Sequence, residues 1–158
     1  GARDTLRLEM GYPLYGHELS EAISPIEAGL GYFVKVDKGE FIGRSALMKQ
    51  KDERPKKKIV AFRMNDKCPP PRQGYEVYNN LEARKEVRSV ASTGFKPQDT
   101  DPVIGTVTSG TQSPSLSCGI GMAQVHIDRA GEGTAIDISI RGKRHPATVC
   151  KKPLYKKQ

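Results

Sequence analysis

The pattern of apolar and polar positions changes along the chain, and its most regular part begins at residue 56. From there on, short alternating or β-branched runs are separated by Gly and Pro, as is typical of strands joined by turns. These runs lie at 58–64, 74–79, 86–92, 103–110, 119–127, 134–142 and 145–151. Such spacing predicts an all-β barrel or sandwich of six to seven strands, and not an alternation of strands with helices.

The last two runs form the clearest strand pair. Ile136, Ile138 and Ile140 alternate with other residues, so they lie on one face of a strand. Gly142 comes two positions after Ile140 and favours a tight turn. We therefore expect a hairpin whose first strand carries three isoleucines on one face.

The first part of the chain has helical spacing instead. Ala2, Leu6 and Met10 recur at intervals of four residues, which predicts an amphipathic helix over 2–10. Gly11 follows directly, and a proline comes soon after it, so we expect the helix to end there.

Three more elements are expected before the β-rich part. Ser24 can cap a short helix, 32–36 is strand-like, and a charged helix should cover about 44–52. The fold class predicted is therefore α+β. Residues 1–55 form the helical and strand-containing tail end of one domain, and residues 56–158 form an all-β, Greek-key-like C-terminal barrel.

Charge follows the same division. Residues 1–55 carry 8 Lys or Arg and 9 Asp or Glu, whereas residues 56–158 carry 18 and 9, so the net charge of +8 belongs to the second part. Its densest basic runs are 55–58, 141–145 and 151–157. Such runs can attract phosphates, acidic proteins or other polyanions. They are not accompanied by a helix-turn-helix, a zinc finger or a platform of stacking aromatics, so nucleic acid is not an expected partner.

Cysteine and histidine spacing suggests no metal site and no catalytic triad. Cys68, Cys118 and Cys150 are odd in number and widely spaced, which is typical of reduced structural thiols. The three histidines are equally scattered. No run approaches the ~18 apolar residues that a membrane-spanning helix needs. Because the chain also opens without a basic-then-apolar leader, neither a membrane nor secretion is expected.

Four motifs occur in order along the chain: A-R-D-T-L-R-L-E at 2–9, P-L-Y-G at 13–16, F-I-G-R at 41–44 and T-S-G-T-Q-S-P-S-L at 108–116. Together with the segments between them, they resemble the C-terminal half of the aminomethyltransferase of the glycine cleavage system, the T-protein family. The resemblance covers essentially the whole chain.

The resemblance implies a ring-like protein of three domains with tetrahydrofolate in a central channel. Family members are much longer than this chain, so we expect a fragment that begins inside the folate-binding domain and ends with the C-terminal barrel. The aspartate that is essential in the family belongs to the missing N-terminal half. No catalytic residue is therefore expected here, and the fragment alone should be inactive.

The implied reaction moves a methylene carbon from the aminomethyl-dihydrolipoyl arm of H-protein to tetrahydrofolate, giving 5,10-methylenetetrahydrofolate and ammonia. Expected partners are lipoylated H-protein, folate and the missing N-terminal half. H-protein is acidic in this family and folates often carry polyglutamate, so the basic barrel could speed their encounter. The short P-L-Y-K-K-Q ending at 153–158 favours a bacterial cytoplasm, and the alternative is the mitochondrial matrix if the source is a eukaryote.

Five residues are candidate folate contacts by this resemblance: Arg3, Asp4, Tyr12, Tyr155 and Lys156. A guanidinium can hold a folate carboxylate through two parallel hydrogen bonds, which suits Arg3. Asp4 could orient Arg3 or face the folate, Tyr12 could pack on it, and the C-terminal pair could reach its tail. The alternatives are an ordinary solvated first helical turn, turn packing and a solvated tail.

Three neighbouring residues are expected to be structural. Arg7 and Glu9 should form ion pairs that support the fold, and Tyr15 should be buried with its hydroxyl group satisfied.

Two other classes of function remain open. A folate-binding module of a sarcosine or dimethylglycine dehydrogenase or oxidase shares the fold, and a dinucleotide-binding G-x-G-x-x-G upstream would favour it. A non-enzymatic basic β-domain that binds polyanions would instead show strongly salt-dependent binding to nucleic acid.

Overall fold

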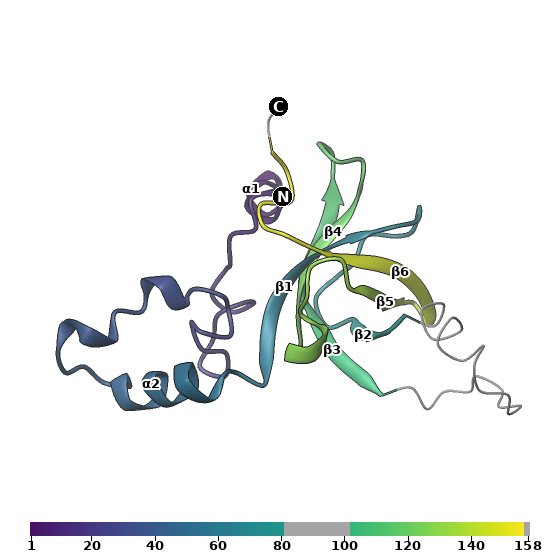
Figure 1. Ribbon diagram of the computed structural model, residues 1–158. Coiled ribbons are helices and arrows are strands. Elements are labelled where there is room, and N and C mark those ends of the chain that lie inside the picture. The colour runs from purple at the N-terminus through teal and green to yellow at the C-terminus, as the bar shows by residue number, and fades with distance from the viewer. Residues whose placement is uncertain (81–101, 157–158) are drawn as a thin grey trace, which may run out of the picture.

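A computed structural model describes residues 1–80 and 102–156, and its centre is a closed antiparallel barrel (Figure 1). The barrel strands are β1 (Lys57–Met64), β2 (Glu76–Asn79), β3 (Val103–Ser113), β4 (Cys118–His126), β5 (Ala135–Ile140) and β6 (Lys143–Cys150). Their order around the barrel is β1-β4-β3-β2-β5-β6, and pairing of β1 with β6 closes it. A short 3-10 helix, η3 (Ile127–Arg129), follows β4.

This arrangement confirms the predicted fold class. Six of the seven predicted runs form strands, and the seventh, 86–92, lies outside the described residues. Strands β2, β3 and β4 are consecutive neighbours and β1 lies beside β4, which is a Greek-key order. The connections from β1 to β2 and from β4 to β5 therefore cross the ends of the barrel.

The predicted hairpin is also confirmed. Ile140 pairs with Lys143, and the two turn residues Arg141 and Gly142 both have positive φ, of 50° and 78°. Two successive positive φ values belong to a type I′ turn, whose twist matches that of the strands it joins. The three isoleucines of β5 are at most 1% exposed and belong to the core inside the barrel.

Strand β1 separates two apolar clusters. Val60, Phe62 and Met64 face the barrel interior, whereas Ile59 and Ala61 face the outside. Because successive side chains of a strand point to opposite faces, one strand can serve both clusters. The outer cluster is then completed by residues from β4, α1 and the C-terminal segment.

Gly121 on β4 leaves room for the largest interior side chain. A Cβ at this position would lie 2.6 Å from the ring of Phe62 and 2.6 Å from the carbonyl oxygen of Ser109. The glycine therefore lets Phe62, which is 0% exposed, fill the barrel where β1 and β4 pair.

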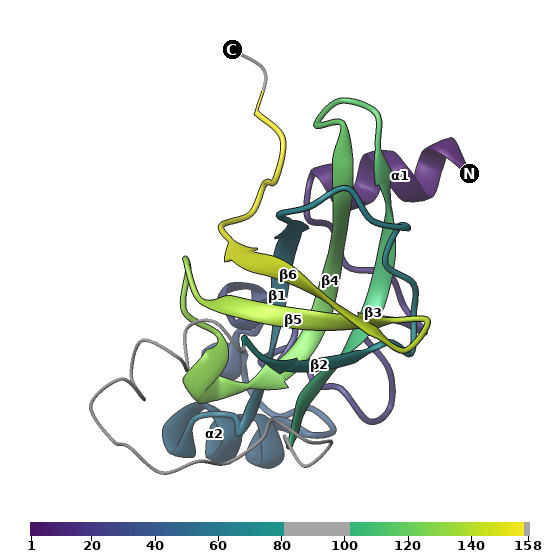
Figure 2. The same ribbon diagram turned by 90° about the vertical axis from the view of Figure 1, so that its right-hand side faces the viewer.

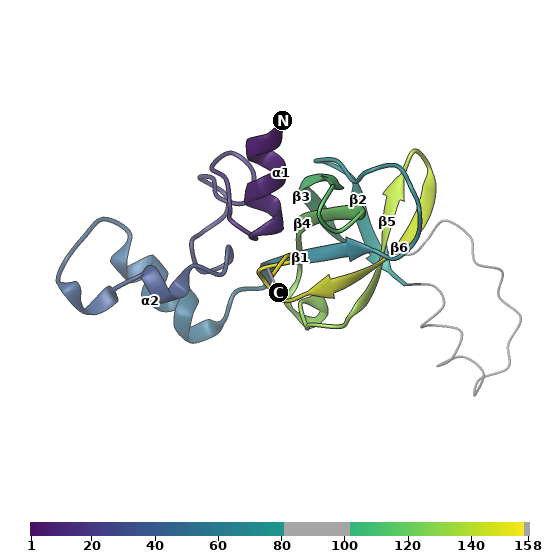
Figure 3. The ribbon, with the colours of Figure 1, turned by 90° about the horizontal axis from the view of Figure 1, so that it is seen from above.

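Helix α1 (Ala2–Glu9) lies against the outside of the barrel beside β3 and β4, as Figures 2 and 3 show. The helix itself was predicted, but its buried face was predicted wrongly. Leu6 and Met10 are 61% and 40% exposed, whereas Leu8 is 0% exposed in the outer cluster. Four-residue spacing shows which residues share a face, but contact with the barrel decides which face is buried.

The segment between α1 and β1 differs from the prediction in two places. The Ser24 amide donates to Glu27 and the Glu27 amide donates to Ser24, which is a capping box, but only a turn forms where a short helix was expected. The predicted strand over 32–36 was wrong. The 3-10 helices η1 (Gly31–Phe33) and η2 (Val36–Lys38) cover much of it. The segment pairs with no strand within the described residues, so its strand propensity has no ladder to join.

Helix α2 (Arg44–Glu53) confirms the third predicted helix, and Figure 3 shows it extending away from the barrel. Within residues 1–80 and 102–156, every helix is too short or too polar to cross a membrane.

Candidate functional site

The N-terminal end of α1 borders an open hollow of about 350 Å³. Six residues line it: Gly1, Ala2, Arg3, Asp4, Arg7 and Leu14. Two of the sequence-predicted site residues, Arg3 and Asp4, therefore share one cavity. Arg3 is exposed, and within the described residues its side chain forms no hydrogen bond or ion pair.

Arg7 organises the side of this hollow that faces the barrel. Its Nε donates to Asp4 Oδ1 at 2.8 Å, its Nη1 to Glu18 Oε2 at 2.8 Å and its Nη2 to Ser109 Oγ at 2.8 Å. One guanidinium thus joins α1, the following turn and β3. The expected structural ion pair of Arg7 is confirmed, and Asp4 contacts Arg7 instead of orienting Arg3.

Glu18 is 0% exposed, yet its carboxylate is well satisfied. Besides Arg7, it accepts hydrogen bonds from the Leu14 amide at 3.0 Å and from Thr108 Oγ1 at 2.7 Å. Buried carboxylates are stable where charge and hydrogen bonds compensate for the loss of water. The Arg7–Glu18 pair therefore holds residues 14–18 firmly on β3.

Glu9 fixes the other end of α1 through hydrogen bonds, and within residues 1–80 and 102–156 it does not form the ion pair that was expected. Its carboxylate accepts from Ser113 Oγ and from Ser115 Oγ, at the end of β3 and in the turn after it. Residues 109–113 belong to β3. The strand accordingly fixes Ser113 for its contact with α1, and Ser115 follows in the turn.

The remaining candidate residues lie at the C-terminal end of α1. The Tyr155 amide donates to the carbonyl oxygen of Glu9 at 3.0 Å, so the C-terminal segment returns to α1. Tyr12 is 60% exposed and Lys156 is also exposed. From Arg3 to Glu9 the helix rises about 9 Å, so the five candidates form two groups at opposite ends of α1.

Tyr15 corrects an expectation. It was predicted to be buried, but its side chain is 71% exposed, because the turn at 13–16 points the ring outward while Glu18 makes the buried contact.

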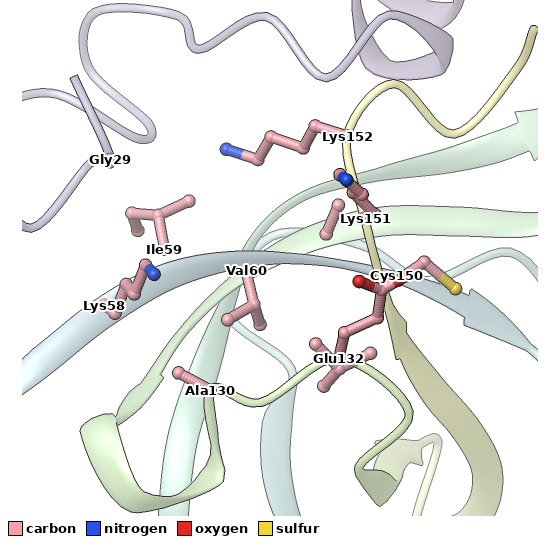
Figure 4. Close-up of a pocket in the computed structure, with 11 residues that line it drawn as sticks. Gly29, Lys58, Ile59, Val60, Ala130, Glu132, Cys150, Lys151 and Lys152 are labelled. Atoms are coloured by element: carbon pink, nitrogen blue, oxygen red, sulfur yellow. The ribbon is translucent and has the colours of Figure 1, made fainter. Parts of the chain in front are cut away.

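A second hollow, of about 330 Å³, lies between β1, β6 and the segment around Gly29 (Figure 4). Lys58, Lys151 and Lys152 border it, and Lys152 reaches across it from the C-terminal segment. Burial lowers the pKa of Lys152 and so does Lys58, while Glu18 acts in the opposite direction. Part of the basic charge predicted for the barrel is thus gathered around one concave surface.

The sequence did not predict that Glu18 and Ser109 bind Arg7 beside the hollow. It also did not predict a separate group of potential metal ligands at one end of the barrel. Asp66, Cys68 and His145 bring their ligand atoms within 4.8 Å of one another, although the sequence indicated no metal site. In sequence His145 follows Asp66 by 79 positions, so no local spacing motif could reveal the group.

Comparison with protein families decides the family of the chain. Residues 57–156 match the model of the glycine cleavage T-protein C-terminal barrel domain, and residues 1–38 match that of the GCVT N-terminal domain. The chain belongs to the glycine cleavage T-protein family.

Individual relatives agree with this assignment. The chain is 46% identical over 155 residues to the aminomethyltransferase of Alkaliphilus oremlandii, covering 98% of this chain and 36% of that protein. It is 44% identical over 158 residues to the aminomethyltransferase of Shouchella clausii, covering 99% of this chain and 37% of the relative. The chain therefore spans little more than a third of the length of these relatives.

A solved structure shares the fold. The glycine cleavage system aminomethyltransferase T from Bartonella henselae superposes with a TM-score of 0.80 at 27% identity, covering 98% of this chain and 38% of that one. The barrel and the segment around α1 thus correspond to one continuous part of a longer T-protein.

Proposed function

We propose that this chain works as the C-terminal part of an aminomethyltransferase, which passes a methylene group from aminomethyl-dihydrolipoyl H-protein to tetrahydrofolate and releases ammonia. The observation that carries the proposal is family membership over both matched regions, together with relatives that are aminomethyltransferases. The aminomethyltransferase relatives favour this reaction over that of a sarcosine or dimethylglycine oxidising enzyme, and over a polyanion-binding module.

Within this reaction, the role proposed for residues 1–55 is to complete the folate pocket. Arg3 is suited to holding a carboxylate of the folate, because its guanidinium is exposed beside a hollow and is not paired with another described side chain. Asp4 faces the same hollow but is neutralised by Arg7. It is therefore better placed to fix α1 than to repel the substrate.

Tyr12, Tyr155 and Lys156 form the second proposed group of contacts. They lie at the far end of α1, where the Tyr155 amide is bound to Glu9. A substrate with an aromatic end and an acidic tail could use both ends of the helix. We assign no catalytic residue to this chain and propose that it is inactive without the rest of the protein.

The contribution of Arg3 can be tested in the full-length protein that contains this chain. Arg3→Ala should weaken tetrahydrofolate binding about tenfold to a hundredfold, because hydrogen bonds to a charged group are lost. The tetrahydrofolate affinity of Arg3→Lys should lie between those of wild type and Arg3→Ala, since an ammonium group keeps the charge but cannot form two parallel hydrogen bonds. Calorimetric titration measures both, with the exposed Arg129→Ala as control.

Two results would count against these assignments separately. Unchanged folate affinity in Arg3→Ala would remove Arg3 from the site. Failure of the wild-type full-length protein to form methylenetetrahydrofolate and ammonia from aminomethylated H-protein would contradict the reaction itself.

The basic barrel suggests a role in encounter with acidic H-protein and polyglutamylated folate. Steering between exposed charges is screened by salt, because the Debye length shortens to about 8 Å at physiological ionic strength. If association with H-protein proceeds at the same rate at low and high salt, the barrel surface does not steer it. We propose a location in the bacterial cytoplasm, and the bacterial origin of these relatives supports the first part of this proposal.

A further inference from the structure

A mixed group of ligand-type side chains lies at the end of the barrel where β1 ends and β6 begins. Asp66 and Cys68 belong to the loop that follows β1, and His145 belongs to β6. No part of the proposed folate site uses these residues. They differ chemically from one another, and together they offer a carboxylate oxygen, a sulfur and an imidazole nitrogen.

Backbone and side-chain contacts hold the two elements together. The Asn65 amide donates to the carbonyl oxygen of Pro146 at 2.9 Å, and Thr148 Oγ1 donates to Asn65 Oδ1 at 3.0 Å. Both contacts join the start of the loop to β6. They lie on either side of Ala147, the β6 residue that pairs with Met64. Asp66 therefore arrives beside His145 on a backbone that is already fixed.

The distances are close to those of a metal site. His145 Nδ1 and Asp66 Oδ2 lie 3.0 Å apart, and the three ligand atoms lie within 4.8 Å of one another. Around a tetrahedral zinc ion with bonds of about 2.0 to 2.3 Å, neighbouring ligand atoms are about 3.3 to 3.8 Å apart. The His145–Asp66 distance is slightly shorter than this range, and the other two distances are no longer than 4.8 Å.

Burial also suits a bound ion. The His145 side chain is 18% exposed and that of Asp66 is 40% exposed, while Cys68 packs against the interior core of the barrel. The site thus has an apolar side and an open side. A cation can enter from solvent and keep one water-occupied position beside three protein ligands.

We propose that Asp66, Cys68 and His145 form a zinc site that fastens the loop after β1 to β6. Sulfur and imidazole ligands favour zinc over magnesium and calcium, which bind oxygen ligands. The barrel is basic overall and therefore does not attract cations in general. The preference for zinc comes from the sulfur and imidazole ligands.

Binding requires a proton to leave the cysteine. Burial, together with the hydrogen bond and the charge of Asp66, raises the pKa of Cys68 to about 11, so the thiol is protonated without metal. As the sulfur–zinc bond forms, the S–H bond breaks and the proton passes to solvent. No oxidant or other reactant is needed.

The chain contains a natural control for this group. His126 Nδ1 and Asp128 Oδ2 are also 3.0 Å apart, but among the described residues no cysteine joins them in a group of potential metal ligands. A histidine–aspartate pair alone should bind zinc weakly. Comparing the two pairs separates the contribution of Cys68 from ordinary surface binding.

The test is calorimetric titration of the purified, metal-stripped chain with zinc chloride, followed by absorption spectroscopy with cobalt(II). We expect one zinc ion per chain and a thiolate-to-cobalt charge-transfer band. Cys68→Ser should abolish the band and weaken zinc binding at least about tenfold, and His145→Gln should also weaken binding by that factor. Cys118→Ser and His126→Gln should leave both signals unchanged.

The proposal also predicts a higher Tm with zinc, because the ion binds the folded chain. This rise should disappear in Cys68→Ser. Absence of stoichiometric zinc binding, a cobalt band that survives Cys68→Ser, or a loss of binding in His126→Gln instead of His145→Gln would each overturn the proposal. If Cys68→Ser fails to give the circular dichroism of a folded barrel, Asp66→Asn replaces it, and unchanged zinc affinity in that variant would equally reject the site.

Discussion

The barrel and the N-terminal segment are stabilised in different ways. The barrel is closed by backbone hydrogen bonds from strand to strand, and its interior contains Phe62 and the three isoleucines of β5. Residues 1–55 have few regular elements, and they attach to the barrel through Leu8 and through charged side chains of their own that bind serine and threonine hydroxyl groups of β3. The barrel therefore depends on apolar packing, and the attached segment depends on a small number of specific polar contacts.

This difference is relevant to the proposed site. The hollow beside Arg3 is bordered by Arg7, so its shape depends on the polar contacts and not directly on the barrel core. Variants in the barrel core should consequently affect the stability of the whole fold. Variants in the polar contacts should affect mainly the attachment of α1 to the barrel.

The largest effect is expected from the barrel interior. Phe62→Ala should lower the free energy of unfolding by about 4 kcal/mol, because a fully buried ring is lost and a cavity remains. Urea unfolding followed by circular dichroism measures this loss. Phe33→Ala serves as control, since Phe33 is 72% exposed and its loss should change stability by less than about 0.5 kcal/mol. Equal effects of the two variants would contradict the assigned core.

A smaller but more localised effect is expected from Arg7→Met. This change keeps the length of the apolar stem but leaves the buried Glu18 carboxylate without its cation, at a cost of about 3 kcal/mol. Arg3→Met is the matched control on the same helix and should be nearly neutral, because Arg3 is exposed. In the double variant with Glu18→Gln, the two losses should not add, since both remove one interaction. Full additivity would show that the ion pair does not stabilise the fold.

Much of the barrel could be predicted because its sequence signal is local. The isoleucines of β5 alternate, and the glycine of the following turn is adjacent in sequence, so both are visible without knowledge of the partner strands. The strand predicted over 32–36 shows the limit of this reasoning. Its residues have strand propensity, but propensity becomes a strand only where another strand supplies hydrogen bonds.

The polar contacts could not be predicted in the same way. Arg7 and Ser109 are 102 positions apart, and the pair forms only because β3 passes beside α1. The resemblance to T-proteins directed attention to Arg3 and Asp4, which do share a hollow. It did not indicate that Asp4 is held by Arg7, because that contact depends on how the helix is turned toward the barrel.

The smallest predicted effect concerns Lys152, which lies where the barrel and the attached segment meet. Burial lowers its pKa below the ordinary value of 10.5, so the folded chain binds the proton less tightly than the unfolded chain does. The charged side chain therefore opposes folding below the lowered pKa, and this opposition fades as pH rises toward about 10.5. Lys152→Met should be slightly more stable than wild type near neutral pH, with a difference that shrinks in alkaline solution. Urea unfolding over that pH range, with the exposed Lys151→Met as control, tests the sign. A difference that grew with pH would mean that the Lys152 charge stabilises the fold, and that Glu18 contributes more than burial does.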